Sequence, residues 1–252
     1  MAHKTLVGGT VYEIKGGKTL INGTAYSIKN GKTLVGGTAY EVGFVSVKEI
    51  LDSWATIAAG TNISKYNIGD WKSIVLTDGT IVIMEIVAFN ADTKTDGTTA
   101  AITWISKDII TTHLMHSSST TKDGWGGSDM RTWLQNDFYA TMPNDVKNAI
   151  VSVNKTYYDY YGSKSTKSCV DNLWIPSVRE MGAGTAETSG AEYTGYFTDK
   201  ASRVKSNANG VASPWWLRSS QSNYDFYMLN YAGNLRNGSR KNANGVVIGF
   251  CT

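Results

Sequence analysis

Residues 215–251 read "WWLRSSQSNYDFYMLNYAGNLRNGSRKNANGVVIGFC" and alternate between apolar runs and polar segments. The apolar runs are short and rich in aromatic or branched side chains, which predicts strands at 215–218, 225–229 and 245–250. The polar segments between them repeat Asn, Tyr, Ser and Gly. These three runs are the last strands predicted in the chain.

Alternation of side chains along the second run places Phe226 and Met228 toward the core and Asp225 and Tyr227 toward solvent. Leu229 then falls on the outer face, so we expect the strand to bulge or end there. We also expect Trp215 or Trp216 to pack in the core, Arg218 to be held by a buried or backbone acceptor, and Leu235 to be a buried anchor.

The polar residues of this stretch come from a small alphabet. Between Ser219 and Asn244, 14 of 26 residues are Asn, Ser, Tyr or Asp. Tyr supplies a large rigid contact surface, and Ser, Asn and Gly supply adaptable hydrogen bonds, as in antibody paratopes. A polar loop between strands is the alternative, but exposed Tyr side chains favour binding. The candidate ligand-binding residues are Ser219, Ser220, Ser222, Asn223, Tyr224, Asp225, Tyr227, Asn230, Tyr231, Asn234, Arg236, Asn237, Ser239, Arg240 and Asn242.

Upstream of this stretch, the sequence predicts a few helices and a strand hairpin. Ser46 and Glu49 form a capping box before an apolar helical pattern that runs to Ala58. Residues 71–89 form two strands around Asp78-Gly79. Further helices are predicted at 128–138, capped by Ser128 and burying Met130, Trp133 and Leu134, at 142–150, with Pro143 in the first turn, and after the capping box Ser177–Glu180. The fold class is α+β, with antiparallel strands, two or three helices and long loops.

The N-terminal part is an internal repeat. The segments 4–17, 18–31 and 32–45 align with a period of fourteen, and each places two strand-like runs around Gly-Gly or Asn-Gly. We therefore expect residues 1–43 to form three short β-hairpins and residues 44–252 to form the main domain. Isolated hairpins bury little surface, so the repeats are expected to serve attachment or self-association.

Charge and composition exclude several classes of function. The first 43 residues hold five Lys and two Glu, and thus carry the whole net charge of +3. The balanced main domain lacks the footprint of a nucleic-acid-binding protein. No apolar run is long enough to insert into a membrane, and the N-terminal sequence lacks the apolar core of a secretory signal peptide. Cys169 and Cys251 are expected to be ordinary thiols.

Residues that carry chemistry are scattered. His113 and His116 are three apart, but no Cys or third His is near, so a surface loop or helix end is preferred over a metal site. No pair of acids stands out as a glycosidase dyad, and "GWGG" (124–127) lacks the Lys of a phosphate-binding loop. We expect no metal, no cofactor and no enzymatic activity.

Four motifs appear in a characteristic order: "SDMRTWL" (128–134), "LWIPS" (173–177), "WWLRSS" (215–220) and "GVVIGFC" (245–251). They resemble C-type-lectin-fold domains related to the formylglycine-generating-enzyme family. The chain is most similar to the variable proteins of diversity-generating retroelements, many of which are phage receptor-binding proteins. In such proteins, template adenines are mutagenised and Asn codons turn into codons for Tyr, Ser, Asp and others, here over about 215–250.

This resemblance implies a C-type lectin-like domain over residues 44–252. Oxidase activity of the family is not expected, because Cys169 is followed by Val-Asp and Cys251 is next to last. The sugar-chelating motifs of calcium-dependent lectins, Glu-Pro-Asn or Gln-Pro-Asp with Trp-Asn-Asp, do not occur.

The leading hypothesis is a receptor-binding protein at a phage tail tip, made in the host cytoplasm without a signal peptide. Its partner would be a host cell-surface protein or glycan. Through the N-terminal repeats it would bind itself as a homotrimer, or another tail protein. A bacterial surface adhesin of the same fold is the alternative, and a glycan-processing enzyme is a weaker one.

Overall fold

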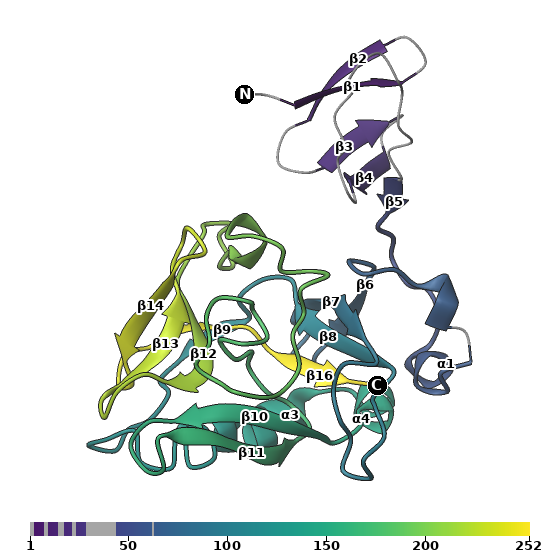
Figure 1. Cartoon of the computed structure of the whole chain (residues 1–252). Coiled ribbons are helices and arrows are strands. Elements are labelled where there is room, and N and C mark those ends of the chain that lie inside the picture. Colours follow the sequence, from purple (N-terminus) through teal and green to yellow (C-terminus); the bar gives the residue numbers. More distant parts are fainter. Residues whose placement is uncertain (1–2, 8–9, 15–17, 22–23, 29–43, 62) are drawn as a thin grey trace. The chain divides into compact units, whose positions relative to one another are not determined.

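The computed structural model describes the backbone of residues 3–7, 10–14, 18–21, 24–28, 44–61 and 63–252, and side chains from Val47 onward. The chain divides into two compact units, Met1–Glu49 and Ile50–Thr252. Figure 1 shows the elements of each unit. The division lies later than the boundary predicted at Gly43, because Phe44–Ser46 pairs with a strand of the first unit.

The first unit is built from short antiparallel strands. Strands β1 (His3–Val7) and β2 (Thr10–Ile14) pair with each other, and β3 (Lys18–Ile21), β4 (Thr24–Ile28) and β5 (Phe44–Ser46) form a three-stranded sheet. The register joins Val7 to Thr10 and Ile21 to Thr24, which confirms the first two predicted hairpins. Most of the third repeat, 32–45, lies outside the described residues.

The predicted helix start at Ser46 is wrong, because Ser46 is the last residue of β5. Helix α1 is Trp54–Ala58, and Ser53 caps it by accepting a hydrogen bond from the N–H of Thr56. The shorter helix buries Trp54 and Ile57 but leaves Leu51 86% exposed, so the apolar pattern overstated the length of the helix.

A four-stranded antiparallel sheet carries much of the core of the second unit. Its order is β16 (Gly249–Cys251), β8 (Ile102–Ser106), β7 (Ile81–Phe89) and β6 (Trp71–Val75). The hairpin predicted at 71–89 is confirmed, with Gly79 in the left-handed region at φ 86°. All residues of β8 are buried.

The predicted helices at 128–138 and 142–150 are confirmed. Helix α2 (Asp129–Trp133) begins after Ser128, whose Oγ accepts from the N–H of Arg131, and continues into the π-helical turn η2 (Leu134–Phe138) and α3 (Tyr139–Thr141). Helix α4 (Asn144–Ala149) follows Pro143. Met130 and Leu134 are fully buried, whereas Trp133 is half-buried and stacks on His113.

The second sheet has five strands in the order β14 (Leu235–Ser239), β13 (Asp225–Leu229), β12 (Trp215–Ser220), β15 (Asn244–Val246) and β9 (Thr111–His113). The single strand predicted at 245–250 is divided: Val247 and Ile248 carry the chain from β15 in this sheet to β16 in the other. Figure 1 shows β12, β13 and β14 side by side, with β14 outermost.

A long hairpin packs beside this sheet. It consists of β10 (Val153–Asp159) and β11 (Ser165–Asp171), and β10 contacts β12. Short 3₁₀ turns occupy Ile63–Lys65 and Ala201–Arg203. The chain is thus α+β, with mostly antiparallel strands and few helices, as the sequence predicted.

Candidate ligand-binding surface

Strand β12 is buried along its whole length. Both Trp215 and Trp216 are fully buried, and the indole N–H of Trp216 donates to the carbonyl of His113 at 2.9 Å. Arg218 donates to the carbonyls of Thr156 and Ile175 at 2.7 and 2.6 Å. The scaffold role predicted for Trp and Arg in this strand is confirmed.

The guanidinium of Arg218 also belongs to a buried ion network. It contacts both carboxylate oxygens of Glu180 at 2.7 and 2.6 Å, and Lys155 bridges Glu180 and Asp92 at 2.5 and 2.6 Å. Burial alone would raise the pKa of Glu180, but the charges of Arg218 and Lys155 outweigh it and lower the pKa from 4.5 to about 2. Two cations balance two carboxylates, so the buried charges neutralise one another.

The capping box at Ser177 forms its two reciprocal hydrogen bonds without opening a helix. The N–H of Ser177 donates to Glu180 at 2.9 Å, and the N–H of Glu180 donates to the Ser177 Oγ at 3.2 Å. The backbone from Val178 to Gly182 forms turns, and Gly182 reaches φ 55°. The helix predicted there is wrong, because this turn serves to hold Glu180 against Arg218.

Ser219 and Ser220 were predicted as ligand contacts, and the structure contradicts this, because both are fully buried. The Ser219 Oγ accepts from the N–H of Val178 at 3.0 Å and donates to the buried carboxylate of Glu187. The Ser220 Oγ accepts from the N–H of Tyr160 at 2.7 Å and donates to the carbonyl of Tyr158 at 2.8 Å. These hydroxyls join β12 to its neighbours.

Arg240 is a second correction, because only 6% of it is exposed. Its guanidinium donates to the carbonyls of Ser118 and Tyr224 at 2.7 and 3.1 Å and lies 5.6 Å from the centre of the Tyr224 ring. The Arg240 side chain therefore packs beside the exposed Tyr224 ring and donates hydrogen bonds to two loop carbonyls, and it does not extend into solvent.

Strand β13 departs from the simple alternation that the sequence predicted. Phe226 is buried as expected, but Met228 is only half-buried and Leu229 is fully buried. Leu229 pairs with Trp215 and with the half-buried Leu235, so these three side chains lie together on one face of the sheet.

Tyr227 is half-buried on the face of β13 opposite Phe226. Burial is the largest cause of its raised pKa, followed by the nearby charge of Glu187 and the neighbouring Tyr158. One part of the Tyr227 ring is therefore exposed to solvent, and the other part packs against the residues beneath it.

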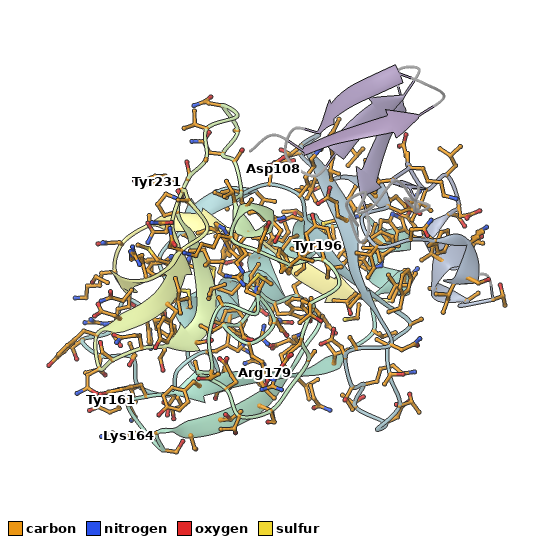
Figure 2. All side chains as sticks on the ribbon, turned by 45° about the horizontal axis from the view of Figure 1, so that its top comes forward. Asp108, Tyr161, Lys164, Arg179, Tyr196 and Tyr231 are labelled. Carbon is orange, nitrogen blue, oxygen red and sulfur yellow. The ribbon has the colours of Figure 1, made fainter. Side chains whose placement is uncertain are left out.

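Six of the predicted contact residues are exposed, and we call them the outer set: Asn223, Tyr224, Tyr231, Arg236, Asn237 and Asn242. Tyr224 is 58% exposed and Tyr231 is 66% exposed. Tyr231 is labelled in Figure 2. Six others are half-buried: Ser222, Asp225, Tyr227, Asn230, Asn234 and Ser239.

Two of the half-buried residues shape the turns that present the outer set. The Ser222 Oγ accepts from the N–H groups of Tyr224 and Asp225, at 3.1 and 3.0 Å. The Asn230 Oδ1 accepts from the N–H groups of Ala232 and Asn234, both at 3.0 Å. Short polar side chains thus hold the β12–β13 and β13–β14 turns.

Sequence reasoning missed a group of Tyr residues in the β10–β11 hairpin. Tyr158 and Tyr160 are half-buried, Tyr161 is 41% exposed, and Lys164 lies 5.6 Å from the centre of the Tyr160 ring. Figure 2 shows Tyr161 and Lys164 at the rim of the same unit. Ser220 ties this hairpin to β12. The signal was the run "TYYDYYG" (156–162), whose four Tyr are unusual in a hairpin tip.

Other features do not point to chemistry at this surface. Within the described residues, no group of three or more His, Cys, Asp or Glu could hold a metal, and Cys169 and Cys251 are free thiols. A hollow of about 560 Å³ lies beside β7 and Asp108, apart from the outer set. No helix in the described part of the chain is long and apolar enough to cross a membrane.

The model of one protein family, described as a domain of unknown function (DUF6273), matches residues 101–251, which is more than half of the chain. The chain belongs to this family. The match takes in β12, the outer set and the ion network except for Asp92. Comparisons with curated proteins and with solved structures give no match.

Proposed function

We propose that this member of the family is a ligand-binding protein that displays a diversified surface on a C-type lectin-like scaffold. One observation carries the proposal: Tyr, Asn and Arg are exposed on β14 and on the turns of a sheet that also contains β12, whose every residue is buried. A polar connecting segment would have no need of Tyr side chains more than half exposed to water.

The composition of the outer set supports binding through rigid aromatic anchors and adaptable amides. Tyr immobilises few torsions when it makes a contact, so it costs little conformational entropy. Asn donates and accepts hydrogen bonds in either orientation. Such a set accepts many ligands by substitution, because none of the six residues fills the core.

We further propose that the protein serves host attachment at a phage tail tip. The hairpins of the first unit would attach it to the particle or join three copies. Several copies would suit weak individual binding, because linked sites gain roughly 10²–10⁴ in avidity when the geometry permits. A bacterial surface adhesin would use the same surface in the same way.

The DNA that flanks the gene tests this function. We expect a reverse-transcriptase gene and a near-copy of the segment that encodes about 215–250, differing at adenines of the template. The differences should fall in codons of the outer set and spare those of Trp215–Arg218. Flanking DNA that lacks both features, together with an invariant segment among sister strains, would remove the basis for diversification.

A further inference from the structure

Strand β14 forms an open edge of the five-stranded sheet. It pairs with β13 on one side, and no described strand pairs with its other side. Figure 1 shows it as the outermost strand of this sheet. An open edge presents backbone N–H and C=O groups that another extended chain is able to bind.

The hydrogen bonds at the two ends of the β13–β14 ladder fix which groups point outward. The N–H of Asn230 donates to the carbonyl of Asn234 at 3.0 Å, and the N–H of Arg240 donates to that of Tyr224 at 3.2 Å. Hydrogen-bonded and non-hydrogen-bonded pairs alternate in an antiparallel ladder. The backbone groups of Leu235, Asn237 and Ser239 therefore point away from β13.

Two of these outward carbonyls are already occupied. That of Leu235 accepts from the Arg236 side chain at 2.9 Å, and that of Ser239 accepts from the N–H of Asn242 at 2.9 Å. The N–H and C=O of Asn237 have no partner among the described residues. Asn237 thus offers a complete donor–acceptor pair at the centre of the edge.

The surroundings of this edge suit a bound strand. Arg236 and Asn237 are exposed. The exposed ring of Tyr224 lies in the turn before β13, and that of Tyr231 lies in the turn that joins β13 to β14, so one ring stands at each end of the ladder. At Gly238, an added Cβ would meet the Trp216 ring at 2.8 Å, so this position faces the core rather than an incoming chain.

Charge distinguishes between possible occupants. Residues 234–242 hold two exposed cations, Arg236 and Lys241, and no acid, whereas Arg240 is buried. The acid beside this edge is the half-buried Asp225 of β13, which accepts from the Asn237 side chain at 3.4 Å. A second copy paired through the same edge would bring two more exposed cations to one short ladder, and like charges across an interface cost several kcal/mol. An acidic segment would instead be attracted.

We propose that β14 binds an extended, acidic segment of a protein ligand as an added strand. This inference rests on the proposed function, because it takes the outer set to be a ligand-binding surface. The edge of β14 would pair with the backbone of the ligand, and Tyr224 and Tyr231 would contact its side chains. Main-chain hydrogen bonds supply affinity that does not depend on the diversified side chains, which select among ligands.

The test uses the full chain and an array of extended peptides that alternate acidic and β-branched residues, with a matched array in which Lys replaces the acids. We expect binding to acidic peptides and little to basic ones. Asn237→Pro removes the outward N–H without breaking the ladder to β13, since Pro is tolerated on an edge strand where its nitrogen faces solvent. It should weaken peptide binding at least about tenfold, equivalent to about 1.4 kcal/mol.

Asn237→Thr is the matched control, because it loses the same side chain but keeps the N–H, so it measures what the Asn237 side chain contributes to binding. We expect the Pro variant to bind the acidic peptides at least about tenfold more weakly than the Thr variant does, equivalent to about 1.4 kcal/mol. If the Pro variant unfolds, the backbone hydrogen bonds can be tested from the side of the peptide. Peptides N-methylated at alternate amides lose N–H donors, so they should bind the native chain more weakly than unmethylated peptides do.

Equal affinities for the Pro and Thr variants, indifference to N-methylation, or no binding of the acidic array would overturn the proposal. A dimer of the native chain that Asn237→Pro abolishes would also overturn it, by making a second copy the occupant. If the flanking DNA lacks a template but Asn237→Pro still loses peptide, the proposed diversification fails and this inference stands.

Discussion

Strands β12 and β14 lie two positions apart in one sheet, yet their environments are opposite. Every residue of β12 is buried, and its Arg218 is enclosed by a carboxylate and two carbonyls. On β14, Arg236 and Asn237 are exposed, and Arg236 donates only to the carbonyl of its own neighbour. Stability therefore depends on β12, whereas substitutions on β14 have few packed partners to disturb.

The contrast between the two strands shows how a fold accommodates variation in its sequence. Buried substitutions create cavities or unpaired charges, whereas exposed ones usually change stability by less than about 0.5 kcal/mol. The buried strand β12 holds the sheet together, whereas the exposed residues of the edge strand β14 can be replaced with little loss of stability.

The largest effect is expected for Arg218→Ala. The substitution leaves Lys155 as the one remaining cation in contact with the carboxylate of Glu180 and empties a fully buried site, so the free energy of unfolding should fall by about 3–5 kcal/mol. Urea unfolding followed by Trp fluorescence measures it. Arg236→Ala is the matched control and should change stability by no more than about 0.5 kcal/mol. Comparable losses in both variants would contradict the contrast between the strands.

Acid should weaken the buried network in a defined window. The pKa of Glu180 is lowered from 4.5 to about 2, so the folded state favours its charged form. The associated stability is present above pH 4.5 and is lost as pH falls toward 2, amounting to about 3 kcal/mol.

Glu180→Gln isolates this contribution, because it removes the titrating group. The difference in unfolding free energy between the native chain and this variant should shrink as pH falls from roughly 5 to 2. A difference that stays constant over this window would mean that Glu180 does not stabilise the fold through its charge.

A smaller effect is expected for Ser219→Ala. The change leaves the N–H of Val178 and one oxygen of the buried Glu187 without the hydroxyl that joins them, at a cost of about 1–3 kcal/mol. Asn242→Ala, in the outer set, serves as the comparison and should be nearly neutral. Thermal melting of both variants decides whether Ser219 is scaffold, and an unchanged melting temperature for Ser219→Ala would return it to the candidate contacts.

The smallest effects on stability are expected for Tyr224→Ala and Tyr231→Ala. Each ring is more than half exposed, so each change should cost no more than about 0.5 kcal/mol. Tyr227→Ala should cost more than either, because its ring is half-buried near Glu187 and Tyr158. Equal losses of stability for the three Tyr variants would show that the exposure of a Tyr ring does not predict how much it stabilises the fold.

The sequence predicted the elements whose signals are local. Asp78-Gly79 between two apolar runs predicted a hairpin, and Ser128 before Met130 and Leu134 predicted a capped helix. The predicted scaffold role of Arg218 was also correct, because a cation in an apolar strand must find an acceptor. Strand β14 was not predicted, because Leu235 is its only aliphatic residue and its pairing comes from β13.

Burial of polar residues was the main failure of the candidate site. Ser219, Ser220 and Arg240 are polar like their exposed neighbours, and their partners are distant in sequence. Ser219 meets Glu187, and Arg240 meets the carbonyl of Ser118. Composition alone therefore could not separate hydroxyls that join strands from those that face solvent.

A direct comparison of two libraries tests the central claim. One library randomises the six residues of the outer set, and the other randomises the six residues Trp215–Ser220; both are displayed and sorted for resistance to protease, which reports folding. The account predicts that most outer-set variants fold, since exposed substitutions are near neutral, and that few β12 variants do. Similar folded fractions in the two libraries would contradict it.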